Sequence, residues 1–253
     1  MSRSVDLNAD MGESFGPWPM GRDADLLRII SSANIACGFH AGDADVMAGT
    51  MKLAVENGVG IGAHPGFLDL QGFGRRRMHV PHATLGNWVR YQLGAAQAMA
   101  RAAGGEVRHL KLHGALANMC SEDVAMARAC YAAALEVDPA IIVMVLAATA
   151  QEAAVKELGC AYAAEIFADR AYNDDATLVD RSKPGAVLPD AAQAARRIVA
   201  MAKAGAQKPA AGERIRSRIY TLCVHGDNPE AVALSGAVRS GLEAAGIAVK
   251  AFG

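Results

Sequence analysis

The sequence predicts an α/β protein, a closed barrel of parallel strands surrounded by helices. Three observations support this fold class: short strand-like runs alternate with longer alanine-rich helical runs, polar residues share one face of several strands, and most strands end in a polar cluster. Repeated strand–helix alternation is typical of a parallel sheet with helices outside it. No change in composition marks a boundary, so we expect one (β/α)-barrel domain over residues 1–253.

The expected elements alternate along the whole chain. Strands are expected at residues 5–10, 34–40, 59–64, 107–113, 140–146, 161–167, 219–225 and 247–252. Helices are expected at residues 45–57, 84–103, 122–135, 149–158, 190–204 and 229–245. Asp43 and Ser121 precede two of these helices as N-caps, because such side chains accept hydrogen bonds from first-turn N–H groups. Residues 204–217 are expected to form a loop.

An open doubly wound sheet is the alternative to a barrel, and the polar residues decide between them. Open sheets bind ligands chiefly at one switch point, whereas barrels collect residues from the ends of many strands. Side chains alternate across a strand, so Asn8 and Asp10 share one face of the strand at 5–10. In the same way, His109, Lys111 and His113 share one face of the strand at 107–113. Barrel interiors are normally filled by branched apolar side chains, so polar inward faces predict a ligand site.

Polar clusters at the strand ends supply the candidate site residues, since barrel enzymes carry their chemistry on the loops there. Four of the seven histidines fall at such ends. The candidate catalytic residues are Asp10, Glu13, His40, His64, Lys111, His113, Asp169, Arg170 and His225. The candidate substrate-binding residues are Asn8, Asp43, Arg75, Asn118 and Asp227.

The residue types indicate acid–base or metal chemistry. Asp10, His40 and His64 could hold a divalent metal with a bound water, although hydrogen-bonded acid–base pairs without metal explain them equally well. Lys111 and Arg170 would attract a carboxylate, oxyanion or phosphoryl group, or else balance buried acids. The sequence contains neither a G-x-S-x-G nucleophile motif nor a P-loop.

Composition excludes several classes of function. The net charge of −1 gives no electrostatic basis for binding nucleic acid or an anionic membrane. The longest apolar run, residues 140–148, is too short to span a bilayer, and the N-terminus lacks a signal-peptide pattern. Five cysteines without a C-x-x-C pair suggest reduced thiols, so a cytoplasmic location is expected.

Six ordered motifs together resemble the LamB/YcsF family, the A subunits of prokaryotic 5-oxoprolinase. They are "DLNADMGE" (6–13), "SANIACGFHAGD" (32–43), "GAHPGF" with "FGRR" (62–67, 73–76), "LKLHGALAN" (110–118), "EIFADRAY" with "LVDRSKPGA" (165–172, 178–186) and "CVHGDNP" (223–229). The resemblance implies a TIM-barrel-like fold of about seven strands, of the glycoside hydrolase/deacetylase type. One of the eight expected strands is therefore surplus or lies outside the barrel.

The resemblance also implies a reaction, the ATP-dependent opening of the lactam of 5-oxo-L-proline to L-glutamate, with Mg²⁺ accompanying ATP. Lys111 and Arg170 would then face phosphate, Asp10 or His40 would activate water, and His64, His113 or His225 would protonate the leaving nitrogen. The family further implies a complex with B and C subunits, and a homo-oligomer is a further expectation.

Two positions depart from the family pattern K-P-H-G-A-L-Y-N, since Leu112 replaces its proline and Ala117 its tyrosine. Asp175-Ala176 stands where the family usually has D-G.

Two other functions remain open. One is a stand-alone metal-dependent hydrolase of the deacetylase kind, which acts on an amide or a modified sugar. The other is a non-catalytic subunit that binds a small carboxylate ligand.

Overall fold

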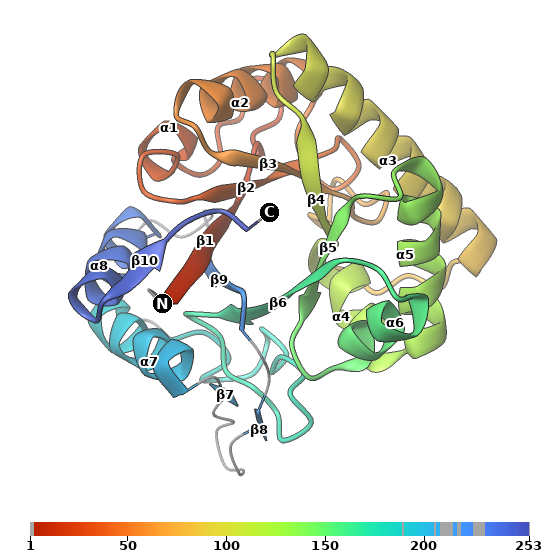
Figure 1. Cartoon of the computed structure of the whole chain (residues 1–253). Coiled ribbons are helices and arrows are strands. Elements are labelled where there is room, and N and C mark those ends of the chain that lie inside the picture. Colours follow the sequence, from red (N-terminus) through yellow and green to blue (C-terminus); the bar gives the residue numbers. More distant parts are fainter. Residues whose placement is uncertain are drawn as a thin grey trace.

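Seven parallel strands close into a barrel, because β1 pairs with the strands on both of its sides. The computed structural model describes residues 3–188, 190–204, 206–207, 215–216, 219–224 and 231–252. In order around the barrel the strands are β1 (Arg3–Met11), β2 (Ser32–Ala36), β3 (Gly60–His64), β4 (Val107–Lys111), β5 (Ile142–Leu146), β6 (Tyr162–Phe167) and β9 (Thr221–Val224). β9 pairs with both β6 and β1, which completes the ring (Figure 1). The predicted barrel is confirmed.

The eighth expected strand lies outside the barrel. β10 (Ile247–Val249) pairs with Arg3–Val5, the part of β1 that precedes its pairings within the ring. The chain then turns across the barrel axis, and Phe252 contacts the ring of His109 edge-on, with centroids 5.3 Å apart (Figure 1). The expected loop at 204–217 was wrong in part, because β7 (Ala206–Gln207) and β8 (Ile215–Arg216) form a short antiparallel pair there.

Helices surround the barrel, as the alternation predicts (Figure 1). They are α1 (Asp23–Leu26), α2 (Ala44–Glu56), α3 (His82–Ala102), α4 (Gly114–Glu122), α5 (Val124–Val137), α6 (Ala150–Leu158), α7 (Ala191–Ala204) and α8 (Ala231–Ala244). Asp43 caps α2 as expected, accepting a hydrogen bond from the N–H of Val46. Asp123, not Ser121, caps α5, because an extra helix, α4, occupies the residues before it.

The apolar faces of the strands form the core between the barrel and its helices. Leu7 on β1, Leu110 on β4, Ile166 on β6 and Leu222 on β9 are fully buried. On these four strands the apolar residues alternate with polar ones that point into the barrel, whereas β5 presents the apolar Met144 and Leu146 to the interior.

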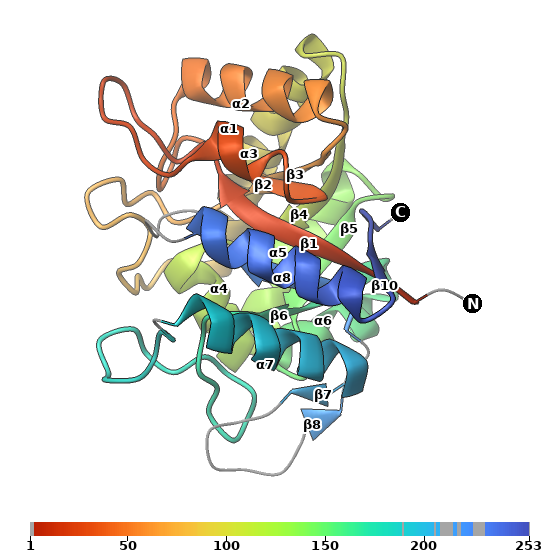
Figure 2. The ribbon, with the colours of Figure 1, turned by 90° about the vertical axis from the view of Figure 1, so that its left-hand side faces the viewer.

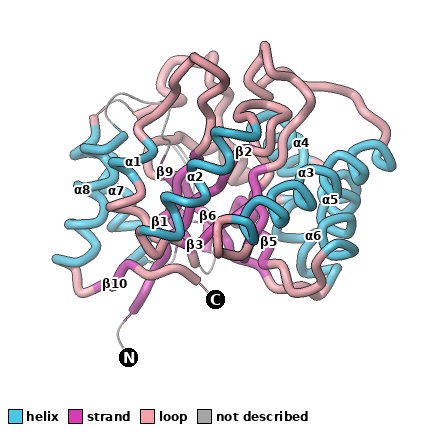
Figure 3. The backbone as a smooth tube through the Cα atoms, turned by 90° about the horizontal axis from the view of Figure 1, so that it is seen from above, coloured by secondary structure: helices cyan, strands magenta, loops and turns pink. Residues whose placement is uncertain are grey.

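Long loops gather at one end of the barrel, and both described chain ends lie at the other (Figures 2 and 3). The loops follow the carboxyl ends of the strands, where barrel proteins place their functional residues. Within the described residues, none of the helices has the length and apolar character that crossing a membrane requires.

Candidate active site

A network of hydrogen-bonded polar side chains lies inside the barrel, between its strands. Asn8 Nδ2 donates to Glu165 Oε1 (2.9 Å) and to Thr221 Oγ1 (2.7 Å). Asn34 Nδ2 donates to Asn8 Oδ1 (2.7 Å) and Asp10 Oδ1 (2.9 Å). These bonds join four strands, and they satisfy amide groups that would otherwise be costly to bury.

Two further buried groups complete this network. His109 Nε2 lies 2.8 Å from Asn34 Oδ1, and burial, followed by the charge of Lys111, lowers the pKa of His109 to about 3. The imidazole is therefore neutral and donates through Nε2. Its ring occupies the space left by Gly62, where a Cβ would lie 2.0 Å from His109 Nε2. Burial raises the pKa of Asp6 to about 6, although Ser31, Ser32 and Thr221 donate to its carboxylate.

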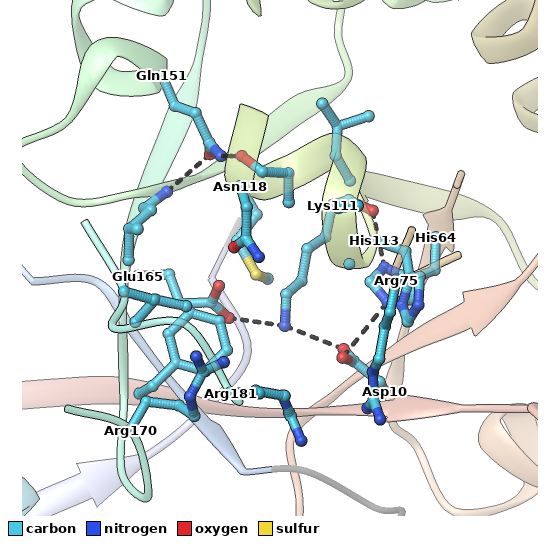
Figure 4. A pocket seen from close by; sticks show the side chains of 18 of the residues that line it. Asp10, His64, Arg75, Lys111, His113, Asn118, Gln151, Glu165, Arg170 and Arg181 are labelled. Atoms are coloured by element: carbon cyan, nitrogen blue, oxygen red, sulfur yellow. Dashed lines mark hydrogen bonds and ion pairs between the residues drawn. The ribbon is translucent and has the colours of Figure 1, made fainter. Parts of the chain in front are cut away.

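Lys111 stands above the network at the centre of the site. Its Nζ lies 2.9 Å from Asp10 Oδ1 and 3.0 Å from Glu165 Oε1 (Figure 4). It also lies 3.0 Å from Cys223 Sγ. Burial alone would lower the pKa of Lys111, but Asp10, Cys223 and Glu165 together raise it well above its ordinary value. Lys111 therefore remains a cation and cannot serve as a base at neutral pH.

Three histidines stand together beside Asp10. His64 Nε2 lies 3.3 Å from Asp10 Oδ2 and 3.0 Å from His113 Nδ1. The ring of His40 stacks on that of His113, with centroids 3.6 Å apart and planes within 4°. Burial and the neighbouring imidazoles hold the pKa values of His40 and His113 well below their ordinary value, so both rings are neutral.

Close packing fixes the histidine cluster. A Cβ on Gly66 would lie 2.6 Å from His40 Nδ1, and a Cβ on Gly74 would lie 2.7 Å from His40 Cβ and 2.8 Å from His113 Cδ2. The loop between β3 and α3 can therefore cover the imidazoles only with glycine at these two positions.

A cavity of about 160 Å³ opens above Lys111. Arg75, Arg170 and Arg181 line it together with the carboxylates and histidines (Figure 4). Arg170 also donates to the carbonyl oxygens of Val179 (2.6 Å) and Ala186 (3.3 Å), which ties the loop after β6 to the cavity wall. Burial lowers the pKa of Arg170 to about 10, so its charge is kept at neutral pH.

The structure brings most of the predicted site residues together. Those that line the cavity are Asp10, Glu13, His64, Arg75, Lys111, His113, Asn118 and Arg170. Asn8 and His40 are fully buried next to them. Two predicted residues do not line the cavity, Asp43 and Asp169. Asp43 caps α2 and accepts a hydrogen bond from Gly16 N, and Asp169 is buried. His225 and Asp227 lie outside the described residues.

Sequence reasoning missed five polar residues of the site: Asn34, Gln151, Glu165, Asp180 and Arg181. Strand alternation could have found Asn34 and Glu165, because each lies two residues from another inward-facing position of its strand. Gln151 lies on α6 and Arg181 on the loop after β6, where no periodicity points toward the barrel axis.

The described residues contain a group that could ligate a metal, and it differs from the predicted set. Ligating atoms of Glu13, His40, His64 and His113 all lie within 4.8 Å of one another. Asp10, predicted as a ligand, bonds to Lys111 through Oδ1 and lies beside His64 through Oδ2. The predicted set of Asp10, His40 and His64 stays a prediction.

The strands form a closed parallel barrel, and a site of carboxylates, histidines and arginines lies at their carboxyl ends. This arrangement defines a TIM-barrel-like α/β protein with an enzyme-like cavity. The model of the LamB/YcsF family matches residues 5–253, and the chain belongs to this family.

Similar proteins agree with this assignment over the full length. The chain is 67% identical over 248 residues to a protein of Ruegeria pomeroyi named as the A subunit of 5-oxoprolinase, covering 98% of each chain. The lactam utilization protein of Thermus thermophilus shares 40% identity and a TM-score of 0.92, over 98% of this chain and all of that one. A family 4 carbohydrate esterase of Streptomyces lividans, at 10% identity and a TM-score of 0.51 over 99% and 93%, shares the fold alone.

Proposed function

We propose that this chain is the A subunit of an ATP-dependent 5-oxoprolinase, which opens the lactam of 5-oxo-L-proline to give L-glutamate, ADP and phosphate. The observation that carries the proposal is the buried, positively charged Lys111, held between Asp10 and Glu165 at the base of a cavity that three arginines line. The full-length similarity to proteins named as 5-oxoprolinase A subunits supports it.

The charges of the cavity suit a small anionic substrate. Arg75 and Arg181 are exposed at the cavity wall, where a guanidinium can bind the ring carboxylate of 5-oxoproline through two hydrogen bonds. Lys111 and Arg170 would stabilise negative charge that develops on the lactam oxygen or on a phosphoryl group.

The reaction needs ATP because an unstrained lactam is a poor electrophile. Transfer of the γ-phosphoryl group to the lactam oxygen releases ADP, and water then adds to the ring carbon. Cleavage of the C–N bond gives an acyl phosphate, which a second water converts to glutamate and phosphate. Asp10 faces the cavity beside His64 and would accept the proton of the attacking water, since Lys111 stays protonated.

The test measures glutamate and ADP formed from 5-oxoproline and ATP with Mg²⁺, for this chain alone and mixed with B and C subunits. The proposal expects equal amounts of both products in the mixture, and at least a hundredfold loss with Lys111→Met. Arg77→Ala serves as the control, because Arg77 pairs with Glu122 on the surface. Glutamate absent from every mixture would overturn the proposal.

A hydrolase that needs no ATP is the second candidate, and the Glu13–His64–His113 group favours it. A metal ion held by this group would supply a bound water activated for attack on an amide. Turnover of 5-oxoproline or of an N-acetyl sugar without ATP, abolished by a chelator, would support this function over the first. A third function, a ligand-binding subunit without catalysis, would leave turnover measurable in the complex that carries Lys111→Met.

A further inference from the structure

We propose that His64, His113 and Glu13 bind one divalent transition-metal ion at the wall of the cavity. All three line the cavity, and all three are at least nine-tenths buried. They come from three different parts of the barrel: His64 ends β3, His113 follows β4, and Glu13 follows β1. The proposal concerns ion binding and does not rest on the proposed function.

The hydrogen bonds of the two histidines fix their tautomers. His64 Nδ1 lies 2.8 Å from the carbonyl oxygen of Lys111, and His113 Nε2 lies 2.8 Å from the carbonyl oxygen of Phe73. A carbonyl oxygen can only accept, so each of these nitrogens carries the hydrogen. Backbone carbonyls commonly orient metal-ligating histidines in this way.

If both rings are neutral, the remaining nitrogens present two lone pairs to each other. His64 Nε2 and His113 Nδ1 are 3.0 Å apart, and neither carries a hydrogen when the rings are neutral. Two buried lone pairs at this distance repel each other unless a cation lies between or beside them. Glu13 Oε1 adds negative charge 3.7 Å from His113 Nδ1. The group therefore attracts a cation.

Two of the three separations between ligand atoms are close to those of tetrahedral coordination, and all three lie within 4.8 Å. Bonds of about 2.0–2.1 Å from zinc to nitrogen or oxygen place tetrahedral ligand atoms about 3.3 Å apart. The two measured separations, 3.0 Å and 3.7 Å, lie on either side of that value. Imidazole and carboxylate ligands suit zinc and the neighbouring transition metals, whereas Mg²⁺ prefers an octahedron of oxygens.

His40 belongs to the cluster but not to the ligand set in this arrangement. A metal lies near the plane of the imidazole that ligates it, and the planes of His40 and His113 are parallel at 3.6 Å. His40 is fully buried and does not line the cavity; its Nε2 lies 3.5 Å from Glu13 Oε1. His40 thus supports His113 and Glu13 and leaves a coordination position open toward the cavity, as catalytic sites do.

The test uses the full chain without substrate, nucleotide or partner subunits. Protein stripped with a chelator is titrated with Zn²⁺ by calorimetry and with Co²⁺ by visible absorption, which reports the ligand geometry. We expect one ion per chain and a tetrahedral Co²⁺ spectrum. His113→Gln and Glu13→Gln should each weaken binding by more than about a hundredfold, the upper effect of losing a mere supporting contact. Circular dichroism identifies which variants fold.

The control is His79→Ala, which removes an exposed histidine and should leave the titration unchanged. Wild-type protein that binds no ion, or binding that survives both ligand substitutions, would overturn the proposal and leave a shared proton between His64 and His113 as the explanation. Because no step of this test measures turnover, its result is independent of the 5-oxoprolinase assay.

Discussion

Lys111 Nζ on β4 lies 3.0 Å from Glu165 Oε1 on β6, two strands away across the barrel. Asp10 on β1 lies on the opposite side of the ammonium group. The two carboxylates and the buried Lys111 cation between them therefore link β1, β4 and β6. Removal of one member of such a group leaves the others as buried charges without compensation, which costs more than the pairing itself contributes.

Lys111→Met should therefore lower stability as well as activity. The substitution keeps the length of the side chain but leaves Asp10 and Glu165 close together without the cation, so we expect the free energy of unfolding to fall by about 3–5 kcal/mol. Urea denaturation followed by circular dichroism measures this. Lys52→Met is the matched control, because Lys52 and its partner Glu56 are both exposed on α2, and it should change stability by less than about 1 kcal/mol.

The opposite face of the same strand should respond differently. Leu110 is fully buried against the helices, so Leu110→Ala should reduce the free energy of unfolding by about 2–5 kcal/mol. The side chain does not enter the cavity, and the variant should keep its kcat where it remains folded. Leu68→Ala, at a leucine that is 56% exposed, provides the comparison. Equal losses in the two variants would contradict the assignment of Leu110 to the core.

Asp6, in the polar network inside the barrel, should make the stability of the fold depend on pH. Burial raises its pKa from 3.8 to about 6, so the folded state holds a proton that the unfolded state has released between these values. Stability from this group is fully present below about pH 3 and lost as the pH rises through 6, a change of about 3 kcal/mol that is complete near pH 7. The stability difference between wild type and Asp6→Asn should change by that amount over about pH 3–7. A difference independent of pH would show that Asp6 ionises normally.

The exposed arginines should act on substrate binding. Arg181→Ala removes a charged donor from the cavity wall, so we expect the KM for 5-oxoproline in the assembled enzyme to rise about tenfold to a hundredfold. The fold should be unaffected, because Arg181 is exposed. Steady-state kinetics that show an unchanged KM, with Arg77→Ala as the reference, would remove Arg181 from the binding surface.

Strand alternation and strand-end clusters predicted much of this site. The rule that places Leu110 outside and Lys111 inside is local, and every barrel strand obeys it, so the fold class and the inward polar face followed from residue order. Eight of the predicted site residues line one cavity for the same reason: parallel strands bring their carboxyl ends to one end of the barrel.

Whether a strand-end residue reaches the cavity depends on contacts that strand alternation does not describe. Asp43 has the sequence context of a strand-end ligand, yet its carboxylate accepts from Val46 N and Gly16 N, because it begins a helix. The extra helix α4 begins at Gly114, which has a positive φ of 54° that a residue with a side chain rarely adopts. Neither the stacking of His40 on His113 nor the reach of Arg181 into the cavity has a periodic signature.

The contact of Phe252 with His109 has a kinetic consequence. This contact and the fully buried network around Asn8 and Asn34 occupy the amino-terminal side of the barrel in the part of the chain that the structure describes. We therefore expect the reactant to enter and the product to leave from the carboxyl ends of the strands, where the cavity is lined. In the proposed reaction the product glutamate keeps the carboxylate of 5-oxoproline, so it should bind at the same site and act as a competitive inhibitor.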